Sequence, residues 1–347
     1  MSSQFHLSLV MLTITTASDR VIPDLIRKFS FAHLYDTVVA LNPVVTAFWL
    51  TGFLISLQIC LSILTRSYAW NDRFWTFIPF AYAVLYTLHP LINQDRRTNS
   101  SLDLRLAVMC SLVLMWSLRL TYGSACRGYY KPGTLDYRYP WLRANIVKND
   151  ALFPIAYAIL VCGMMTVLLA LASSPLYFAW VGRGLSPKFT FVDGVASIGM
   201  LFGIVLEAVA DFQQQRFQRL KANWLKNSER QSDAANDLSS EEVADLKNGF
   251  LQSGLFAWSR HPNYFAEMMV WCSFYLFSVS PSSLWVNWTM SGAVMYIILF
   301  QITTLLTEAI SRQKYPAYDD YRKRVSRLIP SPLSRRAAPF VKGSKED

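Results

Sequence analysis

Long apolar stretches recur along the whole chain, separated by shorter polar segments. A transmembrane helix needs about 20 mostly apolar residues to cross the hydrocarbon of a bilayer. Helices are expected because lipid offers backbone groups no other hydrogen-bond partners. The pattern therefore predicts an all-α fold, a multi-pass transmembrane helical bundle of about seven spans. The predicted spans are Leu41–Leu64, Trp75–Ile92, Leu102–Tyr122, Leu152–Ala172, Phe191–Ala210, Tyr264–Val279 and Leu284–Leu306.

Three regions follow from this pattern. Residues 1–40 form an N-terminal segment, in which Phe5–Ile14 is apolar but lacks the basic start of a secretory signal. Residues 41–330 form the multi-pass membrane domain. Within it, 227–248 is a polar loop, where SSEEVADL predicts a short helix capped by Ser239 or Ser240. Residues 331–347 form a basic tail.

The composition agrees with a membrane protein and excludes several other classes. Hydrophobic residues make up 53% of the chain and charged residues 16%, whereas roughly 25% of an ordinary soluble domain is charged. The five cysteines are scattered without a CxxC pair, so no metal site is predicted. Four histidines are too few for the clustered ligands of a di-iron membrane desaturase. No glycine-rich loop of a soluble nucleotide-binding fold is present.

We interpret the net charge of +10 mainly as a determinant of how the spans are oriented in the membrane. Basic residues concentrate in the loops that face the cytosol. The tail after Thr307 carries ten Lys and Arg, whereas the loop SPSSLW carries none, so the tail and the segment 212–260 are predicted to be cytosolic. Arg96, Arg97 and Arg105 are then predicted to lie on the side opposite the cytosol, which disagrees with the concentration of basic residues in cytosolic loops. A nucleic-acid partner is not expected, because no soluble basic domain is present to hold it.

Polar and ionisable residues gather at one end of the last three predicted spans. Such residues are costly in lipid, and in a membrane protein they are functional candidates by default. Glu207 and Asp211 lie four residues apart and therefore share one helix face. Pro262 suits the first turn of a helix, whose free N–H groups attract anions such as phosphate. The other members of the three clusters are Arg260, His261, Asn263, Tyr264 and Glu267 and, after the last span, Glu308, Arg312 and Tyr315.

All three clusters fall on the predicted cytosolic side. Their agreement predicts a cytosol-open cavity, lined by arginine, asparagine and carboxylate groups, that receives an anionic soluble cofactor. The membrane would deliver an apolar, lipid-like substrate from the side. The alternative is that the same residues form a salt-bridge network between helices, and spacing alone leaves both interpretations open.

Four stretches carry a resemblance to a known family, and RHPNYFAE followed by a KYPxYxxY tail is the most specific part. The chain resembles the DUF1295 family of membrane proteins, relatives of the steroid 5-alpha-reductase C-terminal domain family. The RHPxY part alone is less specific, because isoprenylcysteine carboxyl methyltransferases and phospholipid methyltransferases share a version of it and bind S-adenosylmethionine there. The matching stretches are Trp116–Arg143, Glu207–Phe217, Gly254–Trp271 and Thr307–Pro330.

The resemblance implies a reductase-like membrane domain that binds NADPH on the cytosolic side. Such an enzyme passes hydride to a conjugated C=C bond of a sterol, isoprenoid or enoyl lipid, in the endoplasmic reticulum. By this resemblance, Asp211 matches an aspartate that contacts the cofactor, and Glu207 stands where steroid reductases tend to have asparagine. Asn263 matches the asparagine expected to bind the nicotinamide amide, and Glu267 supports it.

The resemblance also assigns residues near the cofactor phosphates. Arg312 and Tyr315 match an arginine and a tyrosine there, and Arg119 and Arg127 lie near family arginines of the third span. Arginine suits these roles because its planar fork grips phosphate with two hydrogen bonds. Arg260, His261 and Tyr264 belong to the RHPxY motif and complete the expected set of cofactor-binding residues.

One departure from the family leaves the catalytic acid unassigned. Steroid reductases place a substrate-polarising tyrosine just before the first of those arginines, and here Trp116 or its neighbours stand in that place. Tyr122, His89 and Tyr86 are candidates for the role, although aromatic residues in spans are commonly packing or interface residues.

Two other functions stay open at this point. One is an S-adenosylmethionine-dependent membrane methyltransferase, and the other is a non-catalytic lipid-binding membrane protein. Isoprenylcysteine methyltransferases typically carry an adjacent Glu-Glu pair after the last span, where this chain reads TEAIS with one glutamate. The non-catalytic function would agree with the missing acid.

Overall fold

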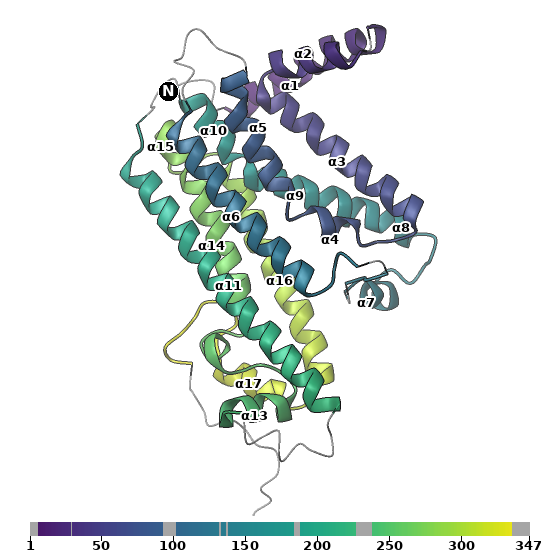
Figure 1. The fold of residues 1–347 in the computed structure, drawn as a ribbon, viewed down its shortest axis with the longest axis vertical. Coiled ribbons are helices and arrows are strands. Elements are labelled where there is room, and N and C mark those ends of the chain that lie inside the picture. Colours follow the sequence, from purple (N-terminus) through teal and green to yellow (C-terminus); the bar gives the residue numbers. More distant parts are fainter. Residues whose placement is uncertain are drawn as a thin grey trace, which may run out of the picture. The chain divides into compact units, whose positions relative to one another are not determined.

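A computed structural model describes residues 6–28, 30–92, 102–131, 133–136, 138–183, 188–226 and 238–334 (Figure 1). Among these residues the regular structure is helical throughout, which confirms the all-α fold class. The chain divides into two compact units, and three helices contribute residues to both. One unit comprises Met1–Leu201 with Trp271–Tyr296, and the other comprises Phe202–Val270 with Ile297–Asp347.

The first unit holds most of the apolar helices. Helix α3 begins at Pro43, where the side chain of Asn42 accepts the Val44 N–H, and α6 is capped in the same way by Asp103. These caps satisfy N–H groups that a helix start leaves without a partner. The elements wholly inside this unit are α1 (Leu7–Arg27), α2 (Phe31–Ala40), α3 (Pro43–Thr65), α4 (Trp70–Phe74), α5 (Ile78–Ile92), α6 (Leu104–Cys126), α7 (Arg138–Asn145), α8 (Phe153–Ala156), the π-helix η2 (Tyr157–Gly163), α9 (Met164–Ser173), α10 (Pro175–Gly182) and α15 (Val279–Ser282).

Three helices have residues in both units. They are α11 (Phe191–Lys226), α14 (Pro262–Leu276) and α16 (Met290–Lys314). The second unit adds three short elements: α13 (Ser240–Asn248), the 3₁₀-helix η4 (Gly254–Ala257) and α17 (Tyr318–Arg324). Its aromatic core consists of Phe250, Tyr318 and Tyr321, packed with Val325.

Five of the seven predicted spans are helices long and apolar enough to cross a membrane, as in an integral membrane protein. They are α3, α6, the run Phe153–Gly182, α11 and α16. The other two predictions correspond to α5 and α14, each of 15 residues. At 1.5 Å per residue, such a helix is about 22 Å long, less than the roughly 30 Å of bilayer hydrocarbon. A multi-pass bundle is therefore supported, while the count of about seven spans stays a prediction.

Several boundaries differ from the sequence prediction. The fourth span continues past Ala172 to Gly182. Helix α11 continues past the end of the apolar span at Ala210 to Lys226, through the polar stretch DFQQQRFQRLKANW, for which the sequence predicts such a helical extension. In the polar loop, Ser239 caps α13: its side chain accepts the Glu242 N–H, and the Glu242 carboxylate accepts the Ser239 N–H. The predicted short helix is thus confirmed. Phe5, the loop residues 227–237 and the tail residues 335–347 lie outside the described residues.

The first unit is held by a fully buried ion pair and a set of indole rings. Arg105 of α6 donates to Asp193 of α11 at 2.9 and 3.0 Å, and also to the carbonyl of Lys188. This pairing neutralises Arg105, whose predicted position opposed the rule for basic loops. Trp116 packs edge-on against Trp271, with ring centroids 5.1 Å apart. The position expected for the substrate-polarising tyrosine is therefore part of a buried aromatic core.

Candidate functional site

In the second unit, α11 and α14 approach closely at a glycine. A Cβ atom added to Gly203 would lie 2.9 Å from a methyl carbon of Val270 and 3.1 Å from the carbonyl oxygen of Ala266. Only a residue without a side chain allows this approach. Farther along α11, the Gln213 side chain accepts the N–H of Leu255, which precedes α14. Increasing residue numbers on α11 therefore match decreasing numbers on α14, so the two helices are antiparallel.

This antiparallel register places the predicted polar residues of α11 and α14 at similar heights along the two helix axes. Glu207 lies one turn beyond Gly203 on α11, and Asp211 lies one turn farther. On α14, Glu267 is next to Ala266, and Asn263 lies one turn closer to the start of the helix. Glu207 and Glu267 are buried, whereas Asp211 and Asn263 are half-buried. The structure thus brings these four residues to the same stretch of the helix pair.

Asn263 differs from its neighbours in its hydrogen bonding. Within the part of the chain that the structure describes, its amide has no hydrogen-bond partner. A carboxamide offers two donors and an acceptor, so an amide left without partners in a half-buried position is suited to a ligand. The three carboxylates on the same stretch, Glu207, Asp211 and Glu267, are acceptors, which complement ligand N–H and O–H groups.

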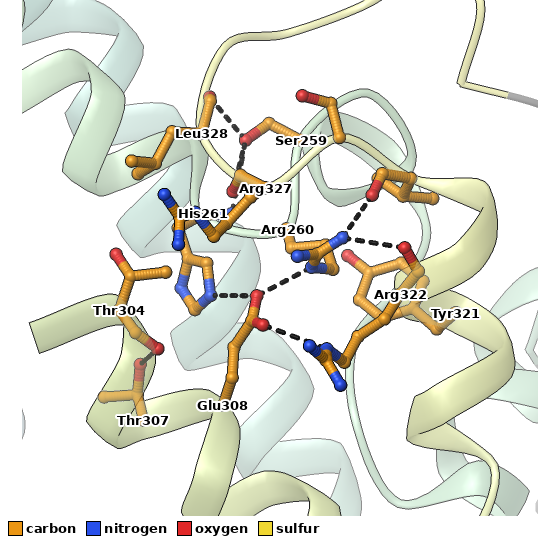
Figure 2. A network of polar contacts seen from close by, with 12 residues as sticks. Ser259, Arg260, His261, Thr304, Thr307, Glu308, Tyr321, Arg322, Arg327 and Leu328 are labelled. Carbon is orange, nitrogen blue, oxygen red and sulfur yellow. Dashed lines mark hydrogen bonds and ion pairs between the residues drawn. The ribbon is translucent and has the colours of Figure 1, made fainter. Parts of the chain in front are cut away.

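A second polar cluster surrounds Glu308 of α16 (Figure 2). Its carboxylate accepts a hydrogen bond from Arg260 Nε at 2.7 Å and contacts His261 Nε2 at 3.2 Å. The other carboxylate oxygen accepts from Arg322 Nε at 3.1 Å. Glu308 and Arg260 are almost completely buried, whereas about a third of the Arg322 side chain is exposed. Three basic groups from two segments therefore converge on one carboxylate.

Two further groups of Arg260, its Nη1 and its backbone N–H, bind the backbone that follows α16. Its Nη1 donates to the carbonyls of Arg322 and Val325, and its own N–H donates to the Ser326 carbonyl at 2.8 Å. Ser259 adds a hydrogen bond to the Leu328 carbonyl at 2.7 Å. These contacts occupy Arg260 and fasten the segment after α17 to the loop before α14. For Arg260, the geometry favours the salt-bridge network over a cofactor phosphate.

His261 and Tyr264 belong to the same loop and helix start. Their rings are stacked at 5.2 Å, and Tyr264 also packs on Phe300 of α16. Burial lowers the pKa of His261, and the Glu308 carboxylate opposes this shift only partly. His261 is therefore expected to be neutral at physiological pH.

Arg312 and Tyr315 lie at the end of α16, where solvent reaches them. Arg312 Nε donates to Asp319 at 2.8 Å, and half of its side chain is exposed. The Tyr315 hydroxyl accepts from Lys221 Nζ at 2.9 Å. Burial acts to raise the pKa of Tyr315, but the hydrogen bond and charge of Lys221, with Lys314, outweigh it and lower that pKa. Lys221 was not predicted, because no local pattern connects it with a residue so distant in sequence.

The remaining candidates belong to the first unit. Arg119 lies on α6, and Arg127 at its C-terminal end is exposed, with its guanidinium 5.4 Å from the centre of the Tyr129 ring. Tyr122 is 72% exposed, and His89 is hydrogen-bonded to the Leu41 carbonyl at 2.8 Å. No group of three metal-binding side chains occurs among the described residues.

Comparison with known proteins identifies relatives but no activity. A family model described as "Protein of unknown function (DUF1295)" matches residues 58–325. A protein of Schizosaccharomyces pombe, described as "Uncharacterized protein C594.04c", is 32% identical over 304 residues, which cover 87% of this chain and 83% of that protein. No solved structure matches.

Proposed function

The chain belongs to the DUF1295 family, and from that starting point we propose that it is a membrane oxidoreductase that transfers hydride from NADPH to a C=C bond of a lipid. The observation that carries the proposal is that the Asn263 amide and the carboxylates of Glu207, Asp211 and Glu267 lie along the same stretch of two antiparallel helices of one unit. The membrane character of the other helices supports an apolar substrate, such as a sterol, an isoprenoid or an enoyl lipid.

The residues present suit most parts of the cofactor. The amide of Asn263 can pair with the nicotinamide carboxamide, and the carboxylates of Glu207 and Asp211 can accept from ribose hydroxyls. Arg312 is solvent-accessible, so it can reach a phosphate by exchanging its contact with Asp319. Arg260 is less suited to that role, because its Nε and Nη1 already donate to Glu308 and to backbone carbonyls.

NADPH would supply the hydride, and the chain would orient it and exclude water. Reduction of a conjugated alkene also needs a donor to the developing enolate oxygen. That donor is unassigned; Tyr122 is a candidate only by its place near the family arginines. A cytosolic C-terminus and a location in the endoplasmic reticulum belong to the same proposal.

Binding of NADPH to the purified full-length chain in detergent tests the proposal directly. We expect saturable binding that weakens about ten-fold or more in Asn263→Ala and in Asp211→Ala, because a hydrogen bond to a ligand contributes on the order of 1 kcal/mol and more when a charge is involved. Asn145→Ala, at an exposed asparagine of α7, is the matched control. All variants should elute and unfold like the unaltered chain.

Each other outcome points to a defined alternative. Binding of S-adenosylmethionine in place of NADPH would favour the methyltransferase. Binding of neither molecule would favour the non-catalytic lipid-binding protein. Normal NADPH affinity in both Asn263→Ala and Asp211→Ala would refute the site.

A further inference from the structure

An open apolar groove lies in the first unit, between α1, α3 and α9. Its volume is about 620 Å³. Its walls include Ile22 and Ile26 of α1, Phe48, Gly52 and Ile55 of α3, and Val167 of α9. Four of these side chains, Ile22, Ile26, Phe48 and Val167, expose more than a third of their surface, although each is large and apolar. The groove therefore presents a broad hydrocarbon surface that the described chain does not cover.

The few polar atoms in the lining are already used within the protein. Trp49 donates its indole N–H to Ser18 of α1 at 3.0 Å. The Thr51 hydroxyl donates to the Ala47 carbonyl at 2.8 Å and shares a 2.6 Å hydrogen bond with Tyr82. A ligand inside the groove is thus offered no polar partner, and ordered water is disfavoured because it needs two or more. The lining selects for an alkyl chain.

The surroundings of the groove have the polarity of a membrane. Helices α3 and α9 belong to candidate spans, so hydrocarbon is the medium expected beside them. Helix α1 buries Val10 and Ile14 and carries charged residues toward its C-terminal end, as expected of a helix in the membrane interface. At that end Asp24 binds Lys28 at 3.2 Å and His33 at 3.0 Å. This charged group marks the end of the groove where the polar part of a lipid belongs.

We infer that this groove binds one hydrocarbon chain of a membrane lipid, whose polar end lies at the charged group formed by Asp24, Lys28 and His33. The volume fits: a group the size of water takes about 30 Å³, so about 620 Å³ holds about 20 such groups, the size of one long alkyl chain. The hydrogen bond between Trp49 and Ser18 joins α3 to α1, so both sides of the groove are held in place by packing within the protein. The inference is independent of the proposed reductase activity.

Gly52 allows a direct test. A Cβ atom added there meets nothing within 4 Å, and Gly52 lines the groove, so Gly52→Phe is chosen to place a ring in the groove without a clash at Cβ. Ile63→Phe is the matched control, because Ile63 is 70% exposed on the same helix and does not line the groove. Val167→Phe fills the groove from α9 and serves as a second, independent block.

The probe is a phosphatidylcholine with a diazirine on one acyl chain, titrated onto the full-length protein in mild detergent. After illumination, mass spectrometry locates the labelled peptides. We expect saturable labelling of the peptides that contain Ile22–Ile26 and Phe48–Ile55. Losing the burial of a few methylenes should weaken this labelling about ten-fold in Gly52→Phe and Val167→Phe, and Ile63→Phe should leave it unchanged.

Two outcomes would overturn the inference. One is labelling that does not saturate and is equal along other exposed apolar faces, such as that of α11. The other is undiminished labelling in a groove-filling variant that elutes as a folded protein. If Gly52→Phe fails to fold, the labelling of Val167→Phe provides the test.

Discussion

Replacing Glu308 by glutamine should destabilise the second unit strongly. The substitution keeps the shape of the side chain and removes the charge on which Arg260, His261 and Arg322 converge. Arg260 would then be a buried cation whose remaining partners are backbone carbonyls. Breaking a buried ion pair costs roughly 3–5 kcal/mol, and because these carbonyls still accept from Arg260 we expect about 3 kcal/mol.

The measurement is the free energy of unfolding in mixed detergent micelles, with Asp319→Asn as the matched control. Asp319 also binds two arginines, Arg312 and Arg322, but it is half-exposed. Solvent screens such pairs, so the control should change stability little. A second check uses Arg260→Met with Glu308→Leu: the double variant should be more stable than Glu308→Gln, because no buried charge is left without its partner.

The result separates a structural carboxylate from a cofactor ligand. If Glu308→Gln were no less stable than Asp319→Asn, the network would not hold the segment after α17 in place. If it kept full stability but lost NADPH binding, Glu308 would belong to the cofactor site instead, and the assignment of the network to structure would be wrong.

Three further predictions follow from other parts of the chain. Burial raises the pKa of Asp245 from 3.8 to about 6, against hydrogen bonds from Ser253 and Gln252; the folded state therefore holds this proton more tightly, and stability should fall as pH rises from about 4 through 6. Thermal unfolding of Asp245→Asn should lack that decline, and an unchanged decline would refute the assignment. Gly292→Ala should lower the thermal midpoint markedly, because its Cβ would meet the backbone of α9, whereas Gly194→Ala, with open space around it, should not. Arg335→Gln with Arg336→Gln should leave NADPH affinity intact, and a ten-fold loss would contradict their interpretation as topology determinants.

Much of the fold was accessible from the sequence because lipid imposes a strong constraint. Apolar stretches long enough to span had to be helical, and α3 and α6 lie close to their predicted positions. Helix α11 begins at the predicted residue, and α16 overlaps its predicted span but is shifted toward the C-terminus. The cap at Ser239 was also predictable, because a capping box depends on residues only three apart. Helices α5 and α14, which correspond to the other two predicted spans, are shorter than the length needed to cross a bilayer. For α14 the ends are set by Pro262 and by the turn after Leu276, regardless of the apolar residues that follow.

The sequence by itself determined which side chains could act and that they gather near the ends of the late spans. It could not decide which of these side chains are hydrogen-bonded within the protein and which remain available to a ligand, because that depends on partners far apart along the chain. Arg260 and Asn263 are three residues apart, yet one meets Glu308 and the other has no hydrogen-bond partner among the described residues. Only the packing of α11, α14 and α16 decided between them, because hydrogen bonds and burial are set by distances of a few ångströms in space.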